Sequence, residues 1–136
     1  MPKWVVYNFA ESTVGDVNAD IQTYLKGVCI NGSVVANSVK ITTSDQNDGD
    51  ARGVVVTNTQ MTSVPAMPDF QGWNVFEFDP ITTDYDELYG NLSTALNNNV
   101  LPDGTSISDN QIYFSQISMT NRQNGHATIT IFYPSL

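Results

Sequence analysis

The sequence predicts an α+β fold built from two tandem pseudo-repeats, each containing a strand, a helix and two hairpins. Two observations predict it. The strand-like segment at 6–9 is echoed at 75–78, and an amphipathic stretch follows each copy. An Asn-Gly turn at 31–32 then matches an Asp-Gly turn at 103–104. Two such units would form mainly antiparallel sheet with two packed helices.

The chain is expected to form one domain. Its 136 residues are enough to bury roughly two-thirds of the unfolded surface around a single core. Within residues 1–136 we expect the first pseudo-repeat at 3–60, a connector at 61–72 and the second pseudo-repeat at 73–134.

The first unit is predicted from its hydrophobic periodicity and its turn residues. Val17, Ile21 and Leu25 recur at the helical period and would form one apolar face. The Asn-Gly pair favours a tight hairpin after this helix. The expected elements are a strand, a helix, a short hairpin and two further strands, at 4–9, 16–26, 28–35, 38–44 and 53–59.

The second unit repeats this order. Leu88, Leu92 and Leu96 lie on one helical face, and Thr83 followed by Asp86 resembles a capping box at the helix start. The expected elements are a strand, a helix ending near Asn97, a turn and two further strands, at 73–78, 83–97, 101–105, 111–119 and 126–133.

The charge balance excludes some partners. Five Lys and Arg residues stand against fourteen Asp and Glu residues, which gives a formal net charge of −9. Few cations are available to neutralise phosphates, so we expect no nucleic-acid partner and no binding to anionic membranes. The start of the chain lacks the features of a signal peptide, so we expect cytoplasmic synthesis, with a virion as a further destination.

Candidate catalytic residues are few. The only cysteine is Cys29 and the only histidine is His126, which are too few for a zinc site built from these residue types. The chain has no Gly-x-Ser-x-Gly elbow and no Gly-x-x-x-x-Gly-Lys phosphate loop. We therefore expect a protein that is not an enzyme, with no catalytic residues and no cofactor.

One acidic turn could bind a cation. Asp45, Asp48 and Asp50 resemble a fragment of a calcium loop, because several oxygen ligands follow one another in a short segment. The distal glutamate that would close such a loop is missing. We interpret this segment as a solvated hairpin turn. A weak calcium or magnesium site is the alternative, and a metal-dependent hydrolase would use the same three residues.

Apolar residues in and around the connector are the best candidates for contact with another molecule. The connector contains Pro65 and Pro68 and has neither a helical nor a strand period, so it should be extended. It is unusually apolar for such a segment. The predicted partner-binding residues are Met61, Val64, Met67, Phe70, Trp73, Phe132 and Tyr133.

These features together favour a non-enzymatic structural or assembly protein that acts through protein–protein contacts. We expect a bacteriophage virion component, such as a tail, neck or capsid-associated subunit. Its partners would be copies of itself or other virion subunits, in a homo-oligomer or a larger assembly. The alternative is a soluble module that binds a small ligand or a glycan in a groove between the two repeats.

Overall fold

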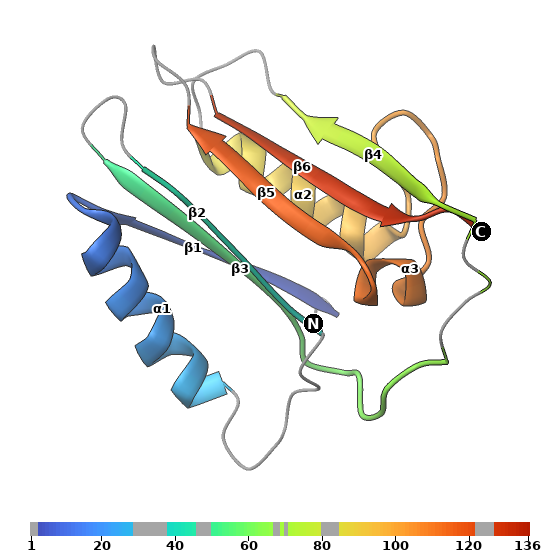
Figure 1. The fold of residues 1–136 in the computed structure, drawn as a ribbon, viewed down its shortest axis with the longest axis horizontal. Coiled ribbons are helices and arrows are strands. Elements are labelled where there is room, and N and C mark those ends of the chain that lie inside the picture. The colour runs from blue at the N-terminus through green and yellow to red at the C-terminus, as the bar shows by residue number, and fades with distance from the viewer. Residues whose placement is uncertain are drawn as a thin grey trace.

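The computed structural model describes residues 3–28, 38–45, 50–66, 69, 71–79, 85–121 and 127–136. It has the predicted α+β class, with three helices and six strands among these residues (Figure 1). In chain order the elements are β1 (Trp4–Glu11), α1 (Val14–Val28), β2 (Val39–Ser44), β3 (Ala51–Asn58), β4 (Trp73–Phe78), α2 (Tyr85–Asn98), α3 (Asp109–Tyr113), β5 (Gln116–Asn121) and β6 (Ala127–Pro134).

The strands form two antiparallel sheets of three strands each. Sheet A has the order β1-β3-β2, and sheet B has the order β4-β6-β5. In both sheets the last strand in the sequence lies between the other two. The sheets approach each other along β2 and β5, where the Met119 amide donates to the Thr42 hydroxyl at 2.9 Å.

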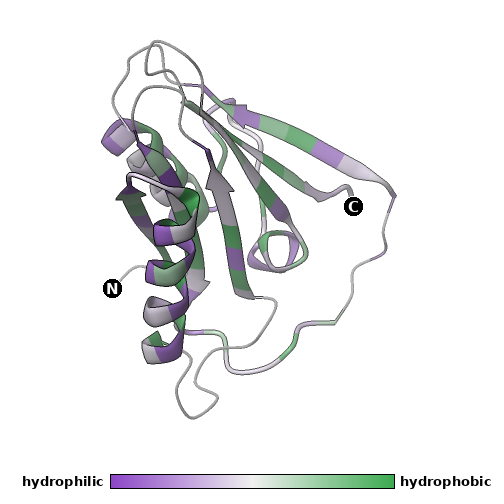
Figure 2. Ribbon diagram, turned by 60° about the vertical axis from the view of Figure 1, so that its left-hand side comes forward, coloured by the Kyte–Doolittle hydropathy of each residue, from purple (hydrophilic) through white to green (hydrophobic). Residues whose placement is uncertain are grey.

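Helix α1 packs on one face of sheet A. Val17 and Ile21 of the helix are buried against Ala51 and Val55 of β3. A Cβ atom built on Gly53 would lie 2.6 Å from a Val17 methyl group, so the missing side chain of this glycine allows the close approach. Figure 2 shows α1 in front of the strands, with hydrophilic and hydrophobic residues alternating along it.

The main core lies on the other face of sheet A and joins the two halves of the chain. Trp4 of β1 and Val54 and Val56 of β3 pack in one cluster with residues of α2 and sheet B. The predicted apolar face of α2 is buried there, including Leu88 and Leu92. Sheet A is therefore covered on both faces. In β3, every residue except Arg52 is buried.

The strand predicted at 111–119 is wrong in its first part. Residues 109–113 form the short helix α3, and β5 begins only at Gln116. The cause is a capping box: the Ser108 hydroxyl accepts from the Gln111 amide, and the Gln111 side chain accepts from the Ser108 amide. These two bonds satisfy the free amides at the helix start, so the local sequence favours a helical turn.

The predicted turn at 101–105 is confirmed. Gly104 has φ of +90°, a conformation that favours glycine, and the Leu101 amide donates to the Thr105 carbonyl at 2.8 Å. The matching turn at 31–32, Thr83, Cys29 and His126 lie outside the described residues.

Candidate functional site

Sheet B has one face that no described helix covers. In Figure 1 this face points toward the viewer, while α2 lies behind the sheet. We call it the open face and define it by its exposed residues, which come from all three strands. They are Trp73, Val75, Glu77, Gln116, Ser118, Thr120 and Phe132. Glu77 is the only charged residue among them.

The register of sheet B brings apolar residues together on the open face. Val75 of β4 pairs with Phe132 of β6, and Phe132 pairs in turn with Gln116 of β5. Because cross-strand partners point to the same side of a sheet, their side chains form a row. Trp73 lies on the same face, since it is two residues from Val75. The exposed fractions are 49% for Trp73, 58% for Val75 and 37% for Phe132.

The other predicted partner-binding residues do not lie on this face. Tyr133 follows Phe132 directly, so strand alternation points it to the opposite side, where it is buried in the main core. Met61 packs partly against that core. Val64 is exposed in the connector. Met67 and Phe70 lie outside the described residues.

The start of the connector is held by an asparagine. Asn58 at the end of β3 accepts hydrogen bonds from the backbone amides of Gln60 at 2.9 Å and Met61 at 3.0 Å. Such an Asx turn fixes the direction of the chain as it leaves the strand. The thioether of Met61 can then pack on the core.

The acidic turn is described only in part. Asp45 and Asp50 are exposed, whereas Asp48 lies outside the described residues. The Asp50 carboxylate forms an ion pair with Arg52 at 3.3 Å. In the part of the chain that the structure describes, no group of three or more Cys, His, Asp or Glu residues is placed to hold a metal ion. The cation site at Asp45, Asp48 and Asp50 stays a prediction.

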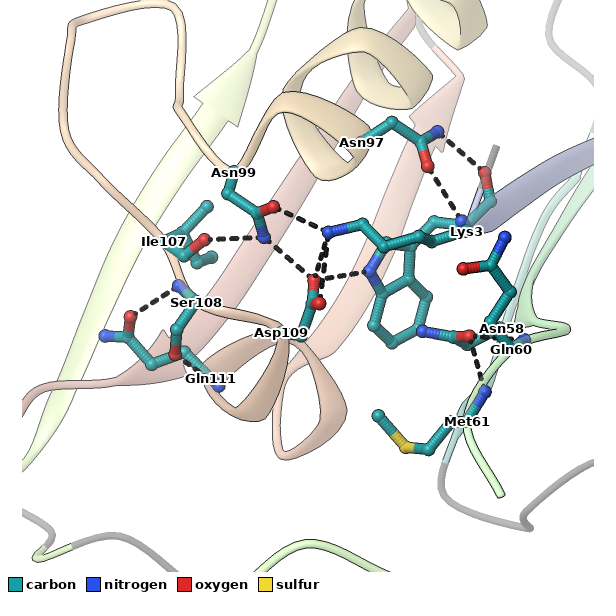
Figure 3. Close-up of polar contacts among 11 residues, drawn as sticks. Lys3, Asn58, Gln60, Met61, Asn97, Asn99, Ile107, Ser108, Asp109 and Gln111 are labelled. Atoms are coloured by element: carbon teal, nitrogen blue, oxygen red, sulfur yellow. Dashed lines mark hydrogen bonds and ion pairs between the residues drawn. The ribbon is translucent and has the colours of Figure 1, made fainter. Parts of the chain in front are cut away.

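A polar network that sequence reasoning missed ties the two halves together (Figure 3). Asp109 at the start of α3 accepts from Lys3 at 3.0 Å, from the Trp4 indole at 3.1 Å and from the Asn99 amide group at 2.8 Å. Asn97 at the end of α2 accepts from the Trp4 amide and donates to the Trp4 carbonyl, both at 2.8 Å. Lys3 and Trp4 lie about a hundred residues before Asn97 and Asp109 in the sequence, so no local motif predicts the contacts between them.

The Asp109 carboxylate is held in its charged form. Burial alone would raise its pKa, but hydrogen bonds from Asn99, Trp4 and Lys3 and the charge of Lys3 together lower the pKa below its ordinary value. A carboxylate that accepts so many hydrogen bonds is a poor general base at neutral pH. This arrangement joins two segments and does not offer a reactive group.

Lys40 is the second feature that the sequence did not reveal. Its ammonium group donates to the Tyr113 carbonyl and lies 5.7 Å from the centre of the Tyr113 ring. Burial lowers the pKa of Lys40 to about 8. This places an amine with an altered pKa at the junction of β2 and α3.

Known proteins give no further guide to this site. No family model, no curated protein and no solved structure matches the chain. Among the described residues, none of the helices has the length and apolar character required to cross a membrane. The open face brings together three exposed large apolar side chains, two of which, Trp73 and Phe132, are predicted partner-binding residues.

Proposed function

We propose that this chain is a non-enzymatic assembly subunit and that the open face of sheet B binds the same face of a second copy. The observation that carries the proposal is the row formed by Trp73, Val75 and Phe132, three large apolar side chains exposed on one side of one sheet. Sheets bury apolar faces by packing on another layer. Sheet A has such a layer on each side, and sheet B has a described helix only on its core side.

The charge distribution favours a second copy as the occupant. The chain carries a net charge of −9, so two copies repel each other at most orientations. The open face contains Glu77 as its only charged residue. Two copies can meet there without bringing many carboxylates together. A two-fold contact also uses the same patch on both subunits, so the patch must be complementary to itself. A face that carries both apolar and hydroxyl side chains suits such a contact.

The size of the face predicts a weak contact. Three strands of about six residues span roughly 14 by 20 Å, on the order of 300 Å². Stable interfaces bury about 800 Å² on each partner. The dimer should therefore form only at high concentration, with a dissociation constant of about 10 µM to 1 mM. Weak contacts of this kind are suited to assemblies in which each subunit makes several of them.

Sedimentation velocity over this concentration range tests the proposal. The wild-type chain should shift from monomer to dimer as its concentration rises. Val75→Lys should remain monomeric, because dimerisation would bury the new ammonium group against the open face of the second copy. Ile41→Lys is the matched control, since Ile41 is 49% exposed on the α1 side of sheet A, and it should dimerise like the wild type. A wild-type chain that stays monomeric throughout would overturn the proposal.

We further propose that the subunit is a component of a bacteriophage virion, in the tail, the neck or the capsid-associated part, where a small acidic subunit would be one of many contacting copies. We also propose that the halves at 3–60 and 73–134 are pseudo-repeats of one unit. The shared strand order of sheets A and B supports the second point. Negative-stain imaging of concentrated protein should show regular particles.

The alternative is a module that binds a small ligand or a glycan between the two halves, and it stays a prediction. Two described grooves, of about 590 and about 490 Å³, both lie along α1 in the first half. Thermal stabilisation by a sugar or another small molecule, without self-association, would favour this alternative.

A further inference from the structure

A groove runs along the outer edge of β1, beside α1. It has a volume of about 490 Å³ and is lined by residues 7–10 of β1 and by Asp20, Thr23 and Tyr24 of α1. Consecutive side chains of a strand point to opposite faces. A groove that touches four consecutive strand residues must therefore follow the edge of the strand and not only one face. β1 is an edge strand, because sheet A has the order β1-β3-β2.

The backbone of β1 presents hydrogen-bonding groups to this groove. The Thr59 amide donates to the Lys3 carbonyl at 3.2 Å. The backbone amides and carbonyls of Lys3 and of every second residue after it therefore point toward β3. Trp4, Asn8 and Ala10 therefore direct their amides and carbonyls outward. Asn97 bonds both groups of Trp4. Among the described residues, no partner bonds the outward backbone groups of Asn8 or Ala10, both of which line the groove.

The α1 side of the groove is aromatic. The rings of Tyr7 and Tyr24 are stacked with their centres 4.5 Å apart, and the ring of Phe9 meets Tyr24 edge-on at 5.8 Å. Tyr7 is 48% exposed although it lies in the middle of a strand. These rings hold one another in place, so the wall is preformed and offers apolar contact to a side chain of a bound segment.

The end of the groove is acidic. Asp20 lines it, and Glu11 lies next to Asp20. The negative charge of Asp20, a side-chain hydrogen bond with Asp20, burial and the charge of Asp16 together raise the pKa of Glu11. The two ion pairs found among the described residues, Lys3–Asp109 and Arg52–Asp50, involve neither carboxylate. A cation brought here would relieve this repulsion.

We propose that this groove binds an extended, basic segment of a partner protein, which adds a fourth strand to sheet A beside β1. The outward backbone groups of Asn8 and Ala10 would supply the ladder hydrogen bonds, as in other cases of strand addition. Tyr7 and Tyr24 would contact an apolar side chain of the segment, and Asp20 with Glu11 would bind a lysine or arginine on the same side of it. The inference does not depend on the open face of sheet B.

A peptide titration followed by NMR tests this proposal. The probe is the peptide Lys-Thr-Val-Thr-Lys-Thr, acetylated and amidated, which places two lysines and the valine on one side of a strand in either direction. The acidic control is Glu-Thr-Val-Thr-Glu-Thr. The basic peptide should shift the amide signals of Asn8 and Ala10 and slow their hydrogen exchange. Its affinity should exceed that of the acidic peptide at least fivefold and fall with added salt.

Two variants separate binding from folding. Asn8→Pro removes an outward amide that makes no bond within the sheet, and edge strands tolerate proline at such positions, so the chain should fold and lose binding. Asp20→Lys reverses the charge of an exposed helix residue and should weaken binding at least fivefold. Asp69→Lys in the connector is the matched control and should bind like the wild type. Equal binding of both peptides, or full binding by folded Asn8→Pro, would overturn the proposal.

Discussion

Among the residues that the structure describes, three cationic side chains make contacts within the fold, although the chain is strongly acidic. Lys3 bonds Asp109, Lys40 bonds the Tyr113 carbonyl, and the Arg52 guanidinium lies 3.9 Å from the centre of the Tyr85 ring. Each of these contacts joins the first half to the second. These three residues therefore lie at contacts between the two halves.

Asp109→Asn tests the network at the first strand. The amide group cannot accept from Lys3, Trp4 and Asn99 together, so the free energy of unfolding should fall by about 1–3 kcal/mol at neutral pH. For a chain of this length, that corresponds to a drop in Tm of about 3–10 °C. Calorimetry measures it, with Asp69→Asn as the control for loss of a surface charge.

The same variant should change the response to acid. The pKa of Asp109 in the folded chain lies below its ordinary value of 3.8. Its contribution to stability is therefore present above that value and is lost as the pH falls through the folded-state pKa. The difference in Tm between wild type and Asp109→Asn should shrink as the pH falls below about 4. A difference that stays constant down to acid pH would contradict this assignment.

Lys40 should react with acetic anhydride with an unusual pH profile. Its pKa of about 8 means that the rate should level off above about pH 9, since the amine is then mostly neutral. A lysine in an unfolded reference peptide should become more reactive up to about pH 10.5. Mass spectrometry of each modified peptide gives both profiles, and parallel profiles would contradict a buried amine.

Deprotonation of Lys40 should also stabilise the fold. Its folded-state pKa is about 8, below the ordinary value of 10.5, so the unfolded chain binds this proton more tightly. The gain in stability should therefore appear as the pH rises from about 8 to about 10.5 and be absent below that range.

At the scale of elements, the contact between α1 and β3 depends on a position without a side chain. Gly53 leaves space for Val17 and Ile21, and it lies in a strand whose neighbouring residues are buried on both faces. An edge strand could shift to accept a larger residue, but β3 is bonded on both sides by β1 and β2. The helix must move instead.

Gly53→Ala should destabilise the chain by about 1–3 kcal/mol, because its methyl group overlaps Val17. Val17→Ala in the same chain should recover part of the loss, so the two effects should not be additive. Gly90→Ala is the matched control: this glycine is exposed in α2 with open space around its Cα, and alanine there should stabilise by about 0.5–1 kcal/mol. Urea unfolding of the wild type, Gly53→Ala, Val17→Ala, the double variant and Gly90→Ala measures these differences.

The sequence predicted those elements whose signal is local. The faces of α1 and α2 follow from apolar residues at the helical period, and the strand at Trp73–Phe78 matches its predicted bounds. α3 was missed because five residues are too few to show a period, and Ser108 with Gln111 was the only local signal. Trp73 and Phe132, which were predicted to bind a partner, are exposed, and that role stays a prediction. The buried position of Tyr133 depends on the register of β6. The groove beside β1 depends on strand order, which no local pattern contains.

At the scale of the whole molecule, one core serves both halves. Trp4, Val54 and Val56 of the first half are fully buried, and they pack in the same cluster as Leu88 and Ile131 of the second. Removing the second half would expose them all. Sheet A also depends on Asn97 and Asp109, which lie in the second half.

A chain that ends at residue 60 should therefore not fold by itself. Circular dichroism should show no cooperative thermal transition, because the second half, which packs on one of the two faces of sheet A, is missing. Adding residues 61–136 as a separate chain should restore a transition if the two halves still recognise each other. A sigmoidal melting curve for residues 1–60 alone would show that the first half has a sufficient core of its own.

The hydrogen bonds between Asn97 and Trp4 have a consequence for the period in which the ribosome is still synthesising the chain. A ribosome releases β1 and β3 well before it has made Asn97, since synthesis runs from the N-terminus. During this interval the first half has no second half to fold with, so the backbone groups of Trp4 lack their partner Asn97, and a neighbouring nascent chain on the same messenger offers the same unpaired backbone groups. The rate of elongation between residues 60 and 97 therefore sets how long each newly made chain is exposed to pairing with the next one.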